Sequence, residues 1–146
     1  MSGVRLDGIF NTMASALSAE SIRMNTTASN LANAGSTGGS DSTTYHAKHP
    51  VFSTIQQELS GGLNQDEQLA GGVRVVDVIQ SQQPLQSQFD PSNPLADENG
   101  RVYITDVNPI AEMTNMIAAS KEYQADVEVM NTTKSLLLQT IHAMNN

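Results

Sequence analysis

The segment from Asn108 to Met144 reads NPIAEMTNMIAASKEYQADVEVMNTTKSLLLQTIHAM and predicts one long helix. Its apolar residues recur in alternating steps of three and four, without an interior Pro or Gly, which is the heptad spacing of a coiled-coil seam. The predicted seam positions are Met113, Met116, Tyr123, Val127, Met130, Leu137, Ile141 and Met144. Ser120 and Lys134 occupy the two remaining slots.

Asn108 and Pro109 mark the start of this helix. An Asn side chain accepts hydrogen bonds from the first free backbone amides, and Pro is tolerated where no intrahelical N–H is needed. At a rise of 1.5 Å per residue, a helix from Pro109 to Met144 is about 54 Å long. Such a rod is too long for one small globular core, so its apolar face requires another long helix from this chain or from other chains.

The N-terminal segment provides a candidate partner helix. The same three-four step connects Phe10, Met13, Leu17, Met24, Thr27 and Leu31. Glu20 is the one charged residue in that series. We expect a helix over residues 5–33 that ends at Ala34-Gly35, with Gly35 as its C-terminal cap.

The predicted seam is weak. Thr and Asn are mediocre helix formers, and Glu20, Ser120 and Lys134 interrupt the apolar series. Helices of this kind gain little stability in the isolated chain, which fits segments that become ordered on assembly. The alternative is an ordinary antiparallel helical hairpin packed on the central segment.

Composition excludes several classes of protein. The 146 residues contain no Cys, so disulfides and thiolate metal sites are absent. The net charge is -8, and residues 35–107 carry nine acidic against three basic residues, which argues against binding nucleic acid or anionic lipid. No apolar run reaches the length of a membrane span, and residues 1–10 lack the apolar core of a signal peptide.

The central segment has the strand and turn pattern of a small β region. Residues 36–44 are Gly, Ser, Thr and Asp, and we expect a flexible loop there. Strands are predicted at 45–55, 73–79 and 101–105, with turns at 60–62 and at Asn99-Gly100 and a polar connector at 64–68. The predicted fold is therefore α+β. Residues 1–34 and 108–146 form a coiled-coil domain of terminal helices, and residues 35–107 form a flexible linker and a small β insert.

No catalytic, cofactor-binding or metal-binding residue is predicted. His46 and His49 lie three apart and would point to opposite faces of a strand, so a shared metal is not expected. Asp97-Glu98-Asn99-Gly100 lacks the first ligand of a calcium loop and is better explained as a turn. Nothing resembles a phosphate loop or a nucleophile elbow, so an enzyme is not expected.

Several stretches resemble a known family. Residues 89–100, FDPSNPLADENG, resemble the signature of bacterial flagellar proximal-rod proteins, as do Asn108 with Glu112-Met113 and the stretch 123–132. Residues 28–34, ASNLANA, are similar to the motif shared across flagellar rod and hook axial proteins. The motif residues are Asn30, Asn33, Asp90, Pro91, Asp97, Asn99, Gly100 and Asn131. Arg101 and Thr105-Asp106 depart from the family pattern, which more often has Tyr and Pro-Asn there.

The resemblance implies a structural subunit of the flagellar proximal rod, the drive shaft that transmits torque for motility. It implies self-association in a helical assembly, with other rod proteins, the basal-body membrane ring and the flagellar type III export apparatus as partners. It also implies a location in the periplasmic rod of the basal body, export without a cleaved signal peptide, and no cofactor. The alternatives are another rod subunit, or a soluble adaptor or export-chaperone-like binding module.

Overall fold

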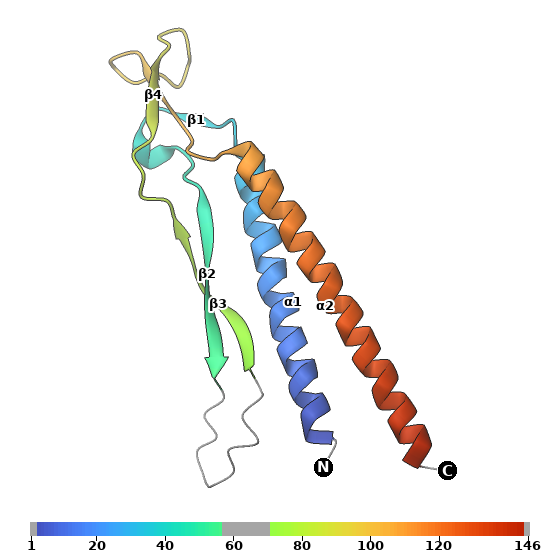
Figure 1. Cartoon of the computed structure of the whole chain (residues 1–146). Coiled ribbons are helices and arrows are strands. Elements are labelled where there is room, and N and C mark those ends of the chain that lie inside the picture. The colour runs from blue at the N-terminus through green and yellow to red at the C-terminus, as the bar shows by residue number, and fades with distance from the viewer. Residues whose placement is uncertain (1–2, 57–70, 145–146) are drawn as a thin grey trace.

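The computed structural model describes residues 3–56 and 71–144, with two long helices beside a small β region (Figure 1). Helix α1 spans Gly3–Ala32 and helix α2 spans Pro109–Met144. The helices run antiparallel, because Asn30 is hydrogen-bonded to Glu112 and Arg23, seven residues earlier, is bonded to Glu122, ten residues later. The predicted α+β fold with two long terminal helices is confirmed.

The start of α2 follows the predicted mechanism. The Asn108 Oδ1 atom accepts hydrogen bonds from the backbone N–H groups of Ile110, at 3.0 Å, and Ala111, at 3.2 Å. The Asn108 carbonyl accepts the first helical bond from Glu112, at 3.0 Å. The side chain therefore satisfies two of the amides that a helix N-terminus leaves free.

The end of α1 differs from the prediction. Among the glycines in the described residues, only Gly100 has a positive φ, so Gly35 is not a left-handed cap. The helix instead closes with tighter turns, in which Asn33 N–H donates to the Asn30 carbonyl and Ala34 N–H donates to the Leu31 carbonyl. Hydrogen bonds between residues three positions apart satisfy the last carbonyl groups of the helix without a left-handed backbone conformation.

A two-stranded antiparallel ribbon runs along α1, which lies between the ribbon and α2 in the view of Figure 1. Strands β2, Lys48–Gln56, and β3, Gly71–Gln80, pair from one end to the other with an irregularity between Val51 and Phe52. The backbone N–H of Val73 donates to the Ser15 Oγ of α1 at 3.2 Å, which fixes the ribbon to the helix. The strands predicted at 45–55 and 73–79 are confirmed, and the predicted turn at 60–62 and connector at 64–68 lie outside the described residues.

A three-stranded antiparallel sheet lies past the end of the ribbon at which β2 begins and β3 ends (Figure 1). Its strand order is β1-β5-β4. Its strands are β1, Thr37–Gly38, β4, Gln86–Phe89, and β5, Arg101–Ile104. Strand β5 confirms the strand predicted at 101–105. Strand β4 was not predicted, because its two glutamines and its serine give no local strand signal and only its pairing with β5 orders it.

Residues 36–44 contain regular structure where the sequence predicted a flexible loop. Strand β1 pairs with β5, and the 3-10 helix η1 spans Asp41–Thr43. Ser40 caps η1 through a reciprocal pair of hydrogen bonds with Thr43, and the Asp41 Oδ1 atom accepts from the backbone N–H of Leu85 at 3.1 Å. Short polar side chains order this segment because they bond directly to nearby backbone groups.

The apolar core is small. Within the described residues the buried apolar side chains are Ala19, Ala47, Leu85, Val102, Val107 and Ala119. The accessible surface is 10462 Å², whereas a compact monomer of 15.6 kDa exposes about 7,200 Å². An extended chain of this kind leaves apolar surface available for contacts with other molecules.

Candidate assembly interface

The face along which α2 contacts α1 is lined by small and polar residues. The buried residues of α2 are Glu112, Ala119 and Thr133, which are separated by seven and fourteen positions. On α1, the buried residues are Ala19, Thr26, Thr27 and Asn30, of which Ala19 and Thr26 are also seven apart. Burial at heptad spacing on both helices is the pattern of a coiled-coil pair. Small side chains at these positions allow the two helix backbones to approach closely.

The buried threonines satisfy their hydroxyl groups within their own helix. Thr26 Oγ1 donates to the Ile22 carbonyl at 2.8 Å, and Thr133 Oγ1 donates to the Val129 carbonyl at 2.9 Å. Bonding to the carbonyl four residues earlier removes the cost of an unpaired buried hydroxyl. Threonine can therefore occupy buried positions of the helix pair, next to the predicted slots that hold Thr27 and Lys134.

The predicted seam residues differ in their burial. Thr27 of α1 is buried, at 4% exposed, and the side chain of Met144 lies outside the described ones. Those that are half-buried in the single chain are Phe10, Met13, Leu17, Met24, Leu31, Met116, Tyr123, Val127, Met130 and Leu137. Met113 and Ile141 are 54% and 45% exposed. The fully buried positions of α2 lie one residue before three predicted slots, at 112 instead of 113, 119 instead of 120 and 133 instead of 134. The part that the predicted residues play in assembly stays a prediction.

Asn30 joins both helices to the β region. Its side chain is 1% exposed and uses every hydrogen-bonding group that it has. Nδ2 donates to the Lys48 carbonyl at 2.8 Å and to Glu112 Oε2 at 3.0 Å. Oδ1 accepts from the Tyr45 hydroxyl and from the Lys48 N–H, both at 2.9 Å. One amide group thus fixes the start of β2 and the first turn of α2 against α1.

Glu112 is the partner of Asn30 on α2 and was noted in the sequence only through the family resemblance. It is 5% exposed, and its Oε1 atom also accepts a weak hydrogen bond from Asn115 Nδ2 at 3.4 Å. A carboxylate in the first turn of a helix is stabilised by the free amides and the dipole there. That position is the signal from which a structural role for Glu112 could have been predicted.

A groove lies between α1, α2 and the ribbon. It has a volume of about 370 Å³. Its apolar lining is Ala16 and Ala19 of α1, Phe52 of β2 and Val73 of β3, and its charged lining is Glu20, Arg23, Glu122 and Asp126. The groove therefore combines an apolar floor with three carboxylates and one guanidinium group.

The charges in this groove are not balanced. Arg23 Nη1 lies 3.0 Å from Glu122 Oε2 and 3.5 Å from Glu20 Oε2, so one cation serves two carboxylates. Burial raises the pKa of Glu20. Arg23 opposes that rise, and the neighbouring Glu122 adds to it by charge and by hydrogen bonding. Asp126 forms no ion pair with any described residue.

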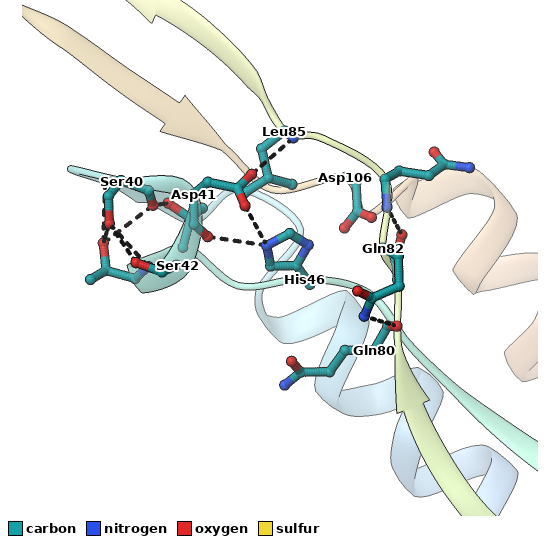
Figure 2. A network of polar contacts seen from close by, with 12 residues as sticks. Ser40, Asp41, Ser42, His46, Gln80, Gln82, Leu85 and Asp106 are labelled. Atoms are coloured by element: carbon teal, nitrogen blue, oxygen red, sulfur yellow. Dashed lines mark hydrogen bonds and ion pairs between the residues drawn. The ribbon is translucent and has the colours of Figure 1, made fainter.

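A second polar network holds the β region together, and Figure 2 shows it around His46. His46 Nε2 lies 3.1 Å from the Asp41 carbonyl and 3.7 Å from its Oδ2 atom. Asp106 accepts a hydrogen bond from the backbone N–H of Ala47 at 2.7 Å. Burial pushes the pKa of Asp106 upward, but hydrogen bonds from Ser81 and Ala47 outweigh it and leave the pKa below its usual value. The network joins segments that are distant in sequence.

His46 and His49 do not form part of a metal cluster within residues 3–56 and 71–144. His46 is turned into the network above, His49 is exposed on β2, and no group of three or more His, Cys, Asp or Glu suited to a metal ion occurs in those ranges. None of the helices that the structure describes is long and apolar enough to cross a membrane.

The motif loop between β4 and β5 is closed by Asp97. Its Oδ1 atom accepts from the backbone N–H groups of Asn99, at 2.9 Å, and Arg101, at 2.8 Å. Gly100 has a φ of 71°, and a Cβ atom there would lie 3.0 Å from the Phe89 ring. The predicted turn at Asn99-Gly100 is confirmed. Phe89 itself is 70% exposed at the edge of the sheet.

The remaining motif residues make local contacts or none. Asn33 Nδ2 donates to the Ser29 carbonyl at 2.8 Å, and Asp90 Oδ1 accepts from the Ser92 hydroxyl at 2.7 Å. Pro91 and Asn131 are exposed. Within the described part of the chain, Asn30 is therefore the motif residue that connects both helices to the insert.

The surface that faces away from α1 carries an apolar stripe on α2. We call it the outer stripe and define it by the exposed residues Ile110, Met113, Ile117, Leu138 and Ile141. Ile110 and Leu138 are four heptads apart, as are Met113 and Ile141, so the same heptad positions are apolar at both ends of the helix. The sequence had assigned Met113 and Ile141 to the seam with the partner helix and had not separated the two faces.

Comparison with known proteins gives matches along almost the whole chain. Residues 10–39 match the family model described as flagella basal body rod protein, and residues 98–142 match that of the flagellar basal body rod FlgEFG protein C-terminal region. The chain is 47% identical over 133 residues to the flagellar basal-body rod protein FlgC of Salmonella typhimurium, and the match covers 91% of this chain and 93% of that protein. The FlgC protein of Escherichia coli O157:H7 gives the same identity and coverage. The FlgC protein of Buchnera aphidicola subsp. Baizongia pistaciae is 34% identical over 136 residues, with 93% of this chain and 96% of that protein covered.

Proposed function

This chain belongs to the FlgC family of flagellar basal-body rod proteins, so it is a structural subunit of the flagellar rod, and we propose that it assembles there through its paired helices. In this proposal α1 and α2 pair within one subunit. The other faces of the two helices then pack against helices of neighbouring subunits in the proximal rod.

The outer stripe is the observation that carries this proposal. Five large apolar residues lie exposed in two clusters, one at each end of one long helix, and both clusters are buried when a second long helix packs along it. A contact between two different surfaces of neighbouring subunits extends into a helical filament when its rotation does not close into a ring. That geometry suits the hollow shaft of a rod.

The same geometry suits the transmission of torque. Helices that lie side by side in many subunits share a torsional load over many weak contacts, so no single residue has to bear it. The partners that we propose are other rod proteins, further copies of this chain and the membrane ring of the basal body. We also propose that the flagellar type III apparatus exports the chain, without a cleaved signal peptide, and that it assembles in the periplasm.

The small core supports a route through a narrow export channel. A chain must be unfolded to pass such a channel, and a structure with few buried apolar side chains offers little resistance to unfolding. The low intrinsic helix propensity of the Thr and Asn residues acts in the same direction. Contacts with neighbouring subunits would then supply the stability that the isolated chain lacks.

The experiment that tests this function is the recovery of the chain from purified hook-basal bodies. Detergent-resistant hook-basal bodies are isolated from motile cells, and peptides of this chain are measured by mass spectrometry against a known hook protein. We expect the chain in a constant ratio to the hook protein, and none in the same fraction from a strain that lacks its gene. Recovery only in the soluble cytoplasmic fraction, in a small closed complex, would instead support an adaptor.

A further inference from the structure

The groove between α1, α2 and the ribbon lacks a positive charge. Glu122 and Asp126 lie four residues apart on α2, and like charges at this spacing destabilise a helix. Arg23 is already shared between Glu20 and Glu122. The groove therefore carries two more negative charges than positive ones, above an apolar floor that includes Phe52 and Val73.

Lys134, in contrast, is a positive charge without a negatively charged neighbour. It is exposed on α2, and its neighbours three and four positions away are Met130, Asn131, Leu137 and Leu138, none of them acidic. It forms no ion pair with any residue that the structure describes. It also shares its heptad position with Met113 and Ile141 of the outer stripe, so it loses water when that stripe is covered.

We propose that Lys134 of one copy inserts into the groove of a neighbouring copy and forms ion pairs there with Asp126 and Glu122. This inference rests on the proposed assembly of the chain in the rod and specifies one contact within it. The four-carbon stem of a lysine covers an apolar surface such as Phe52 and Val73 while its ammonium group reaches the carboxylates at the rim.

The position on the helix selects Lys134 among the lysines of α2. Lys121 is also exposed, but it shares its heptad position with Thr114, Glu128 and Ser135, on a polar face that stays in contact with water. A lysine on a polar face gains little from an ion pair, because water already solvates it. Lys121 is therefore the matched control for Lys134.

Exchange of the two charges tests the contact. Lys134→Glu alone and Asp126→Lys alone should each lower the number of copies per basal body by about tenfold, because each places like charges in the same interface. The combination of both changes should restore incorporation and motility. Lys121→Glu should leave both unchanged. Circular dichroism of each purified full-length variant shows whether the helices are retained.

Two results would overturn the inference. One is normal incorporation of Lys134→Glu, and the other is a double variant that is no better than either single variant. If Asp126→Lys is harmful while Lys134→Glu is harmless, the groove is assigned to a basic side chain of a different rod protein. Absence of the wild-type chain from basal bodies would instead refute the rod function itself.

Cysteine cross-linking gives a second readout, because the chain has no native cysteine. Copies with Asp126→Cys and copies with Lys134→Cys, each with a different epitope tag, are produced together, and the rods are treated with a short bismaleimide, because the backbones of a Lys–Asp ion pair lie too far apart for a direct disulfide. Each copy carries a single cysteine, so any cross-linked product must join two copies. We expect a dimer that carries both tags, and its absence from assembled rods would contradict the contact.

Discussion

The Nδ2 atom of Asn30 lies 3.0 Å from Glu112 Oε2 across the pair of long helices, and both side chains are buried. This contact is polar, yet it lies at the junction where α1, α2 and the start of β2 meet. The position of the insert relative to the helices therefore depends in part on these hydrogen bonds.

Replacement of Asn30 by Ala should destabilise the chain by about 3 kcal/mol, because it leaves a buried carboxylate and the Lys48 backbone groups without partners. The free energy of unfolding of the purified chain, from a urea titration followed by circular dichroism, measures this loss. Asn33→Ala is the matched control. Asn33 makes one local bond, to the Ser29 carbonyl, and its loss should cost less than about 1 kcal/mol. Equal effects of the two variants would contradict the junction role of Asn30.

Replacement of Glu20 by Gln should stabilise the chain at neutral pH. Burial, with the charge of Glu122, raises the pKa of Glu20 above 4.5 against the opposing effect of Arg23. The folded chain therefore binds the proton of the Glu20 carboxyl group more tightly than the unfolded chain does. The stability that this protonation contributes is lost as the pH rises through the raised pKa. Gln stays neutral throughout, so the gain should be present at pH 7 and disappear below about pH 4.5.

Urea midpoints measured at pH 7 and pH 4 test this pH dependence. Glu98→Gln is the control, because Glu98 is exposed in the loop before β5 and makes no ion pair with the described residues. A Glu20→Gln variant that is less stable than the natural chain at pH 7 would show that the ion pair with Arg23 outweighs burial.

Replacement of Gly100 by Ala should destabilise the motif loop by about 1–2 kcal/mol, because a positive φ is unfavourable for a residue with a Cβ atom. The new methyl group would also lie 3.0 Å from the Phe89 ring and from Pro91 Cβ. Hydrogen exchange at the amides of Asn99 and Arg101 should become faster. Gly35→Ala is the control, since a Cβ there meets no atom within 4 Å, and it should leave exchange in this loop unchanged.

Simultaneous replacement of Val127 and Leu137 by Asp should block assembly of the rod while the β insert stays folded. Both residues are half-buried on α2, and a carboxylate at either position is unfavourable once a neighbouring helix covers it. Motility, electron microscopy of basal bodies and NMR of the insert residues provide the measurements. The control changes the exposed residues Thr132 and Ser135 to Asp. An intact basal body in the Val127 and Leu137 variant would argue against the role of the predicted seam in assembly.

The elements that were predicted correctly are those whose sequence signals lie within the element itself. The heptad pattern and the Asn108-Pro109 pair located α2, and the run of β-branched residues located β3. Residues 36–44 were misjudged because β1 is ordered by pairing with β5, more than sixty residues away. No composition of Gly, Ser and Thr reveals a partner at that distance.

The sequence predicted that the two helices exist better than it predicted which face of each helix is buried. The sequence pattern gave most weight to large apolar side chains, such as Met113, and these are divided between two faces of α2. The fully buried positions instead hold Ala119 and Thr133, whose small size lets the backbones approach. Asn30 was identified only through the family motif, because a buried amide has no periodic signal in a single sequence.

The hydrogen bond between Arg23 and Glu122 joins residues 99 positions apart. Ribosomes make a chain from its N-terminus, so α1 is complete long before any residue of α2 exists. The pairing of the helices is consequently one of the last steps available to a newly made molecule. The outer stripe also belongs to α2 alone, and no copy can recruit a neighbour through it until that late stage. In the proposed assembly, an unfinished chain therefore has no outer stripe through which it could pack against a neighbour.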